Sequence, residues 1–140
     1  MRGGVKLIKT HLTSKEYEIM QVLWNSDKPL LMSEITKLTK SVSVNSMHPM
    51  INHLIDKGLV KVVGNIKVVK VPSRLYAPAI SAEDFSAMQS SYMFKNLNKK
   101  FDLRNFLLCF TKRYKMNEDE IVNELEKFIE DYKKSNKSEE

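Results

Sequence analysis

The stretch "SVNSMHPMINHLIDKGLVKVV", residues 43–63, changes its apolar spacing at Gly58. After that glycine, valine recurs in the pattern of a β-strand. Ser43 can cap a helix at its start, and Gly58 can supply the left-handed residue that often follows a helix end. The stretch therefore predicts a helix followed directly by a strand. The apolar residues before the glycine recur at the spacing of one buried helical face: Val44, Met47, Ile51 and Leu54.

Two further helices are predicted upstream of this one. In "TSKEYEIMQVLW", Thr13 and Glu16 form a capping box, and apolar residues follow at helical spacing. Ser33 can cap a short helix over residues 34–40. The chain therefore begins with three helices.

A β-hairpin is predicted after the third helix. "LVKVVGNIKVVKV", residues 59–71, is rich in valine, and Gly64 and Asn65 predict a turn between two strands. "RLYAP", residues 74–78, predicts a short final extended piece. Three helices followed by a hairpin is the order of a winged helix-turn-helix. The residues alone leave another small α+β domain open.

The second half of the chain, residues 81–140, predicts three more helices. Their apolar faces carry more large groups than so small a bundle can bury, which favours completion by a second copy of the chain. The alternative is that these helices pack back on the first domain. We therefore expect a mainly helical chain with a winged helix over residues 1–80 and a helical dimerisation domain over residues 81–140. The expected dimerisation residues are Phe85, Met88, Tyr92, Phe106, Phe110, Leu125, Phe128 and Tyr132.

Charge is unevenly distributed along the chain. Residues 1–80 hold 12 Lys and Arg against 5 Asp and Glu, a net of +7, whereas residues 81–140 hold 11 against 12, a net of −1. A basic first half indicates a module that binds a polyanion such as double-stranded DNA. Lysine-rich solvated faces are the alternative.

The remaining composition predicts a cytoplasmic protein. The single cysteine, Cys109, excludes an internal disulfide and suits a reducing compartment. Because it falls within an apolar stripe, we expect a buried structural thiol. No apolar run is long enough to predict a membrane span.

No arrangement of residues predicts catalysis, a cofactor or a metal. The chain has no glycine-rich phosphate loop, no spaced carboxylate pair and no Cys-His pattern. His48 and His53 are five residues apart, about 140° around a helix, so they are poorly placed to share a metal. We expect a binding protein and not an enzyme.

The chain resembles the family of penicillinase, methicillin-resistance and copper-transport repressors. The resemblance implies a homodimeric transcriptional repressor with an N-terminal winged helix and a C-terminal dimerisation domain. It further implies a two-fold-related operator that overlaps a promoter, and an upstream sensor protease as a possible partner. The stretches that carry it are "LTSKEYEIMQVLW", "SVNSMHPMINHLIDKGLV", "RLYAP" and the spacing of the three C-terminal helices.

The expected DNA-reading helix departs from the family pattern. That pattern shows Lys, Thr, Arg, Thr and Arg on the exposed side, and here two arginine positions are histidines and the lysine position is Asn45. Neutral side chains release fewer counterions from DNA, although asparagine can still pair with adenine. The hairpin is about five residues longer than the family's usual wing, and its basic residues can compensate. The expected DNA-binding residues are Ser43, Asn45, Ser46, His48, Asn52, His53, Lys61, Lys67, Lys70 and Arg74.

Pro49 stands inside the predicted reading helix. It lacks the N–H that would bond the Asn45 carbonyl, a loss that costs roughly 3 kcal/mol in a straight helix. Either the helix is kinked there, which we favour, or residues 44–48 form a turn and the helix starts at Pro49.

Two regulatory features of the family are missing. The chain has no cluster of C-terminal cysteines, and "FKNLNKKF" lacks the Asn-Phe dipeptide that the sensor protease cuts in the β-lactam-responsive members. The altered helix leaves a second interpretation open, a protein-interaction module that has lost operator binding.

Overall fold

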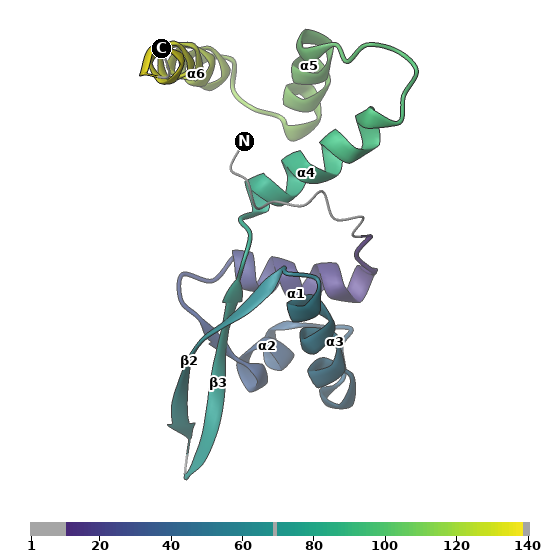
Figure 1. The fold of residues 1–140 in the computed structure, drawn as a ribbon, viewed down its shortest axis with the longest axis vertical. Coiled ribbons are helices and arrows are strands. Elements are labelled where there is room, and N and C mark those ends of the chain that lie inside the picture. The colour runs from purple at the N-terminus through teal and green to yellow at the C-terminus, as the bar shows by residue number, and fades with distance from the viewer. Residues whose placement is uncertain (1–10, 69, 139–140) are drawn as a thin grey trace. The chain divides into compact units, whose positions relative to one another are not determined.

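The computed structural model describes residues 11–68 and 70–138 (Figure 1). The chain forms two compact units, Met1–Leu97 and Asn98–Glu140. The first unit contains α1 (Ser14–Trp24), β1 (Leu30–Leu31), α2 (Met32–Leu38), α3 (Val44–Asp56), β2 (Val60–Val68), β3 (Val71–Pro78) and α4 (Ala82–Lys95). The second contains α5 (Leu103–Tyr114) and α6 (Glu118–Ser138).

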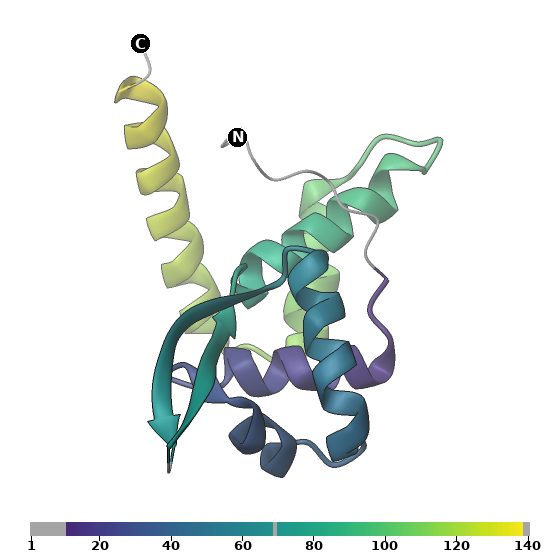
Figure 2. The same ribbon diagram turned by 60° about the horizontal axis from the view of Figure 1, so that its bottom comes forward.

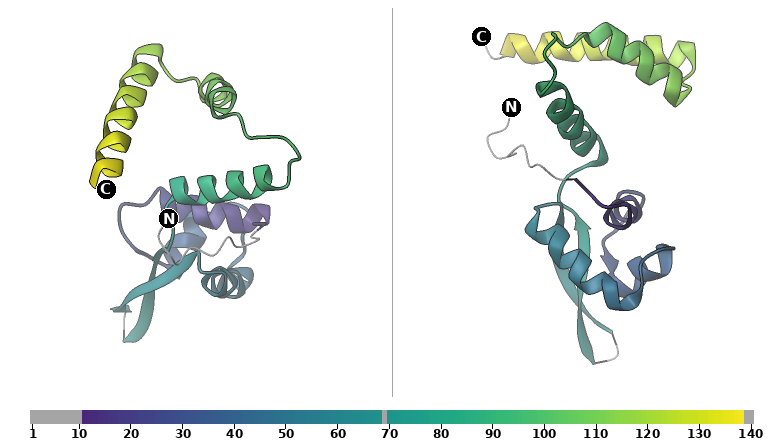
Figure 3. Two further views of the ribbon diagram at one scale, coloured as in Figure 1. Left: turned by 45° about the horizontal axis from the view of Figure 1, so that its top comes forward. Right: turned by 90° about the vertical axis from the view of Figure 1, so that its right-hand side faces the viewer.

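The first unit is a winged helix-turn-helix, as predicted. Its strands form an antiparallel sheet in the order β1-β3-β2. The β2–β3 hairpin extends past α2 and α3 as the wing (Figures 1 and 3). The fold class is therefore mainly helical, with a small sheet.

The core lies between the three helices and the sheet. Met47, Ile51 and Leu54 of α3 are fully buried, as their spacing predicts. Val44 is 74% exposed, so its predicted burial was wrong. It is the first residue of α3 and lies beyond the part of the helix that packs on the core.

Local sequence signals set most helix ends. Thr13 caps α1 with the reciprocal Glu16 bonds, and Ser43 and Ser81 cap α3 and α4. Gly58 has φ 79°, and the Leu59 N–H donates to the carbonyl of Leu54 in the bond that closes a helix C-terminus.

The predicted start of α2 was wrong. This helix begins at Met32 and ends at Leu38, and Ser33 lies inside it. The Leu31 N–H donates to the Glu34 carboxylate. This hydrogen bond satisfies a backbone donor at the start of α2 in the absence of a side-chain cap.

The hairpin turn also differs from the prediction. β2 runs without a break through Gly64 and Asn65, and the chain reverses between Val68 and Val71, which face each other. The register shifts between Val62 and Gly64. Gly64 therefore marks a β-bulge, the other common use of glycine in a strand.

Helix α4 packs on the winged helix. The rings of Trp24 and Phe85 lie 5.4 Å apart, and the Trp24 indole Nε1–H donates to the Ile80 carbonyl at 2.9 Å. Phe85 and Met88 are buried in the same core as α1 and α3. The first unit therefore extends to Leu97, past the expected boundary at residue 80.

The second unit buries little of its own apolar surface. No side chain of α5 is buried, and the apolar residues of α6 are exposed or half-buried. Cys109 is exposed, so its predicted burial was wrong, because α5 has no covering layer within its own unit. None of the helices in the described ranges is long and apolar enough to span a bilayer.

Candidate nucleic-acid interface

Helix α3 has one apolar face in the core and one polar face in solvent. Asn45, His48 and Asn52 are exposed and lie three, four and seven residues apart, which places them along one side of the helix. The Asn52 Nδ2 and His48 Nε2 atoms lie 3.3 Å apart. This face supplies donors and acceptors but no lysine or arginine.

The first turn of α3 uses two of the predicted reading residues for capping. Ser43 Oγ accepts from the Ser46 amide at 3.3 Å and donates to Ser46 Oγ at 3.0 Å. The Ser43 hydroxyl therefore holds the exposed end of the helix, and Ser46 is half-buried beside it.

Helix α3 is continuous from Val44 to Asp56, with Pro49 inside it. The alternative in which the helix starts at Pro49 is therefore wrong. Pro49 is exposed and lacks the N–H that would bond the Asn45 carbonyl in a regular helix.

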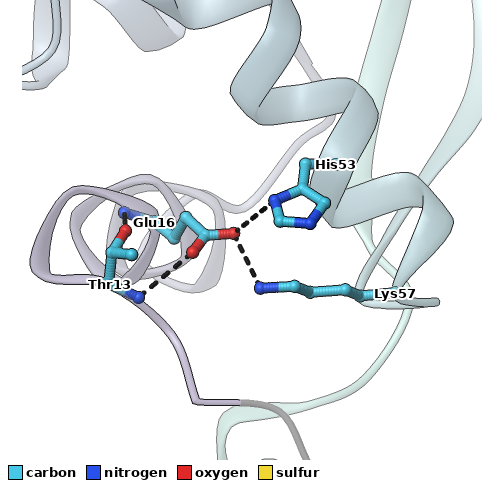
Figure 4. A network of polar contacts seen from close by, with 4 residues as sticks. All are labelled: Thr13, Glu16, His53 and Lys57. Atoms are coloured by element: carbon cyan, nitrogen blue, oxygen red, sulfur yellow. Dashed lines mark hydrogen bonds and ion pairs between the residues drawn. The ribbon is translucent and has the colours of Figure 1, made fainter.

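A buried carboxylate ties α3 to α1. Figure 2 shows α3 crossing α1, and Figure 4 shows Glu16 between the two helices. The Glu16 side chain is 4% exposed, and its Oε2 lies 3.0 Å from Lys57 Nζ and 3.4 Å from His53 Nδ1. Its Oε1 accepts from the Thr13 amide at 3.1 Å. One carboxylate therefore closes the α1 cap and holds the last turn of α3.

The contacts of Glu16 favour its charged form. Burial raises the pKa of this carboxyl, but the Thr13 hydrogen bonds and the Lys57 ammonium lower it more, and the net pKa is below 4.5. An ionised Glu16 attracts the cation of Lys57, and a protonated one does not.

A second carboxylate holds the turn between α2 and α3. Glu18 accepts bonds from the Ser41 hydroxyl and from the Lys40 amide. The Ser41 hydroxyl bond is the largest cause that lowers the pKa of Glu18. Glu18 thus holds the turn that leads into α3, and Glu16 holds the last turn of α3.

The basic residues of the wing do not share one face. Arg74 pairs with Asn65, and Lys67 pairs with Pro72. Side chains two residues apart on a strand share a face, so Arg74 and Lys67 lie on the same face of the hairpin as Tyr76. Tyr76 is buried nearer the base of the hairpin. Lys61 pairs with Ala77 on the opposite face. Lys70 stands at the tip with φ 88°. Lys67, Lys70 and Arg74 are all exposed.

The structure brings some of the expected DNA-binding residues together and separates others. Asn45, His48 and Asn52 form one exposed set, which we call the α3 face. Lys67, Lys70 and Arg74 form another, which we call the wing cations. His53 points to Glu16, Ser43 and Ser46 cap the helix, and Lys61 lies on the other side of the hairpin.

Sequence reasoning missed the positioning roles of Glu16, Glu18 and Lys57. The capping box identified Glu16 as a helix-start residue. Its bond to Lys57 spans 41 residues, so no local pattern could have indicated it.

The fold of the first unit defines a winged-helix protein. The family model described as penicillinase repressor matches residues 12–131. The chain belongs to the penicillinase repressor family, whose members are non-enzymatic transcriptional repressors that bind DNA. The predictions of the family and of a non-enzymatic protein are confirmed.

Several solved structures are similar to this chain, among them two complexes with DNA. One is Bacillus subtilis PadR in complex with operator DNA, at 14% identity and TM-score 0.43, with 77% of this chain and 64% of PadR covered. The other is Streptococcus pneumoniae FabT in complex with DNA, at 15% identity and TM-score 0.41, with 86% and 78% covered. This chain thus spans less than two thirds of the PadR chain. No curated protein matches it.

Proposed function

We propose that the protein is a homodimeric repressor that binds a two-fold-related operator in double-stranded DNA. The α3 face carries the proposal: three exposed polar side chains, on the second helix of a helix-turn-helix, that the core does not use. In such folds this helix enters the major groove. Asn45 and Asn52 can each pair with an adenine edge, and His48 can contact base edges.

The wing cations supply the affinity that α3 lacks. Residues 44–56 contain no lysine or arginine. Contacts from Lys67, Lys70 and Arg74 to phosphates would hold the duplex without reading its sequence. The +7 net charge of residues 1–80 supports a role of this domain in binding phosphates.

The second unit, together with Tyr92 of α4, would join the two copies. Phe110, Phe128 and Tyr132 are about half exposed in the single chain. Exposed rings of this size favour an interface with another copy. Phe85 and Met88 are used within the first unit, so the proposed interface rests on the other expected residues: Tyr92, Phe106, Phe110, Leu125, Phe128 and Tyr132.

Selection from a random duplex library tests this function. A dimer that reads two half-sites should enrich an inverted repeat whose halves are about one helical turn, 10–10.5 base pairs, or a multiple of it apart. Fluorescence anisotropy should then show the enriched duplex bound at least about 1,000-fold more tightly than a scrambled one. No enrichment, with equal affinity for both duplexes, would instead support the interaction-module interpretation.

A further inference from the structure

Residues of α1 and α4 line a cleft in the first unit. The two helices lie side by side (Figure 3, left). The volume of the cleft is about 440 Å³, within the ~300–1,000 Å³ range of small-molecule sites. Both helices belong to the same compact unit. The cleft is separate from the α3 face and from the wing cations, so DNA binding does not account for it.

Aromatic rings build one side of the cleft. The Trp24 ring lies 6.2 Å from that of Tyr17, edge to face, and 5.4 Å from that of Phe85. The Trp24 indole N–H is already bonded to the Ile80 carbonyl, so the ring is held in place. Fixed rings of this kind offer stacking and edge contacts to another flat ring.

The polar groups of the cleft are side-chain amides, hydroxyls and the Trp24 indole N–H. Gln21, Asn25 and Ser86 line it and are exposed. The Gln21 and Asn25 side chains have no hydrogen-bond partner among the described residues. No lining residue in the described part of the chain is charged, although 29% of the chain is Asp, Glu, Lys or Arg. An ion would find no counter-charge here, whereas a neutral amide would find matching donors and acceptors.

We propose that this cleft binds an uncharged, planar aromatic molecule that carries an amide group. The rings would stack on Trp24 and Tyr17, and the amide would bond to Gln21 or Asn25. The site rests on the fold of the first unit alone and does not depend on DNA binding.

The position of the cleft makes its occupant a candidate effector. Tyr17 and Gln21 lie on α1, the helix from which Glu16 holds Lys57 and Glu18 holds Ser41. A ligand that shifts α1 would change how α3 is held. This effector role, unlike the site itself, rests on the proposed DNA-binding function.

The single tryptophan makes binding directly observable. A ¹⁵N-labelled full-length protein has one indole N–H resonance, which comes from Trp24. Titration with naphthalene-2-carboxamide should shift this resonance to saturation with a Kd of about 1 mM or below. Naphthalene-2-carboxylate, the charged analogue of the same shape, should bind at least tenfold more weakly. No shift with the amide, or equal affinity for both probes, would overturn the site.

Two matched variants locate the binding. Ser86→Phe fills the cleft from α4 and should weaken the amide at least tenfold. Ser91→Phe adds the same ring at an exposed position of α4 that does not line the cleft, and it should leave the Kd unchanged. Equal affinities in the two variants would place the probe elsewhere and contradict the proposal.

Linkage tests the effector role. The Kd of the amide should change at least twofold when the enriched duplex saturates the protein, and the amide should change the affinity for the duplex by the same factor. Equal amide affinity with and without bound duplex would refute the effector role. If no duplex is bound at all, the proposed function fails, while the indole titration still decides the site.

Discussion

His53 Nδ1 lies 3.4 Å from Oε2 of Glu16, so a histidine of α3 contacts α1. The same carboxylate oxygen bonds Lys57 one turn later. The contact assigns these two residues to positioning α3, whereas Asn45, His48 and Asn52 form the exposed α3 face.

Replacing Glu16 with Gln should destabilise the protein by about 1–3 kcal/mol, because the amide can keep the cap but leaves Lys57 without its counter-charge. Urea unfolding at pH 7 and fixed protein concentration measures this. Glu34→Gln is the matched control, because Glu34 accepts a cap bond from Leu31 and has no ion pair among the described residues. An equal loss in both variants would mean that the cation contacts of Glu16 contribute nothing.

The Glu16 contribution should depend on pH in a defined direction. Its pKa in the folded protein is below the ordinary 4.5, so its stabilisation is full above about pH 4.5 and is lost as the pH falls through the folded pKa. The free-energy gap between wild type and Glu16→Gln should therefore shrink as the pH falls below about 4.5. A gap that grows below pH 4.5 would contradict the assigned direction.

Replacing Pro49 with Ala should raise the free energy of unfolding by roughly 1–3 kcal/mol. The helix is already continuous at this position, and alanine restores the N–H that can bond the Asn45 carbonyl. His48→Ala, at the neighbouring exposed position, controls for helix propensity alone. A fall in stability on removal of the proline would show that the local backbone suits proline better than a regular helix.

Dimerisation should depend on the exposed face of α6. Phe128→Asp in the full chain should shift the sedimentation profile from dimer toward monomer, because a charge would replace a ring in the proposed interface. Asn123→Asp adds the same charge at another exposed α6 position and should leave the dimer intact. If Phe128→Asp remains fully dimeric at micromolar concentration, the proposed interface is wrong.

Local patterns predicted most of the first unit. The cap residues Thr13 and Ser43 and the C-terminal Gly58 each act within a few residues of themselves, so sequence spacing was sufficient to find them. Gly64 was misread because a glycine suits a bulge as well as a turn, and the choice depends on strand pairing.

Contacts between residues far apart in the chain could not be predicted from the sequence. The helical spacing of Phe85 would be the same whether it packed on Trp24 or on a second copy of the chain. The structure shows that it packs on Trp24. Likewise, the charge count treated Lys61 and Lys67 alike, whereas the shifted register places them on opposite faces of the wing. The bulge that moves the register is what separates them.

This separation allows the most direct test of the proposal that α3 reads bases and the wing cations bind phosphates. Affinities of the enriched and scrambled duplexes would be measured from low to high salt for Lys67→Ala, Lys61→Ala and Asn52→Ala. Lys67→Ala should lower the slope of log Kd against log salt by about one unit on both duplexes, and Lys61→Ala should leave it unchanged. Asn52→Ala should weaken only the enriched duplex, by roughly 1–3 kcal/mol, at an unchanged slope. Equal slopes for the two lysine variants, with an Asn52→Ala loss that is the same on both duplexes, would contradict the account.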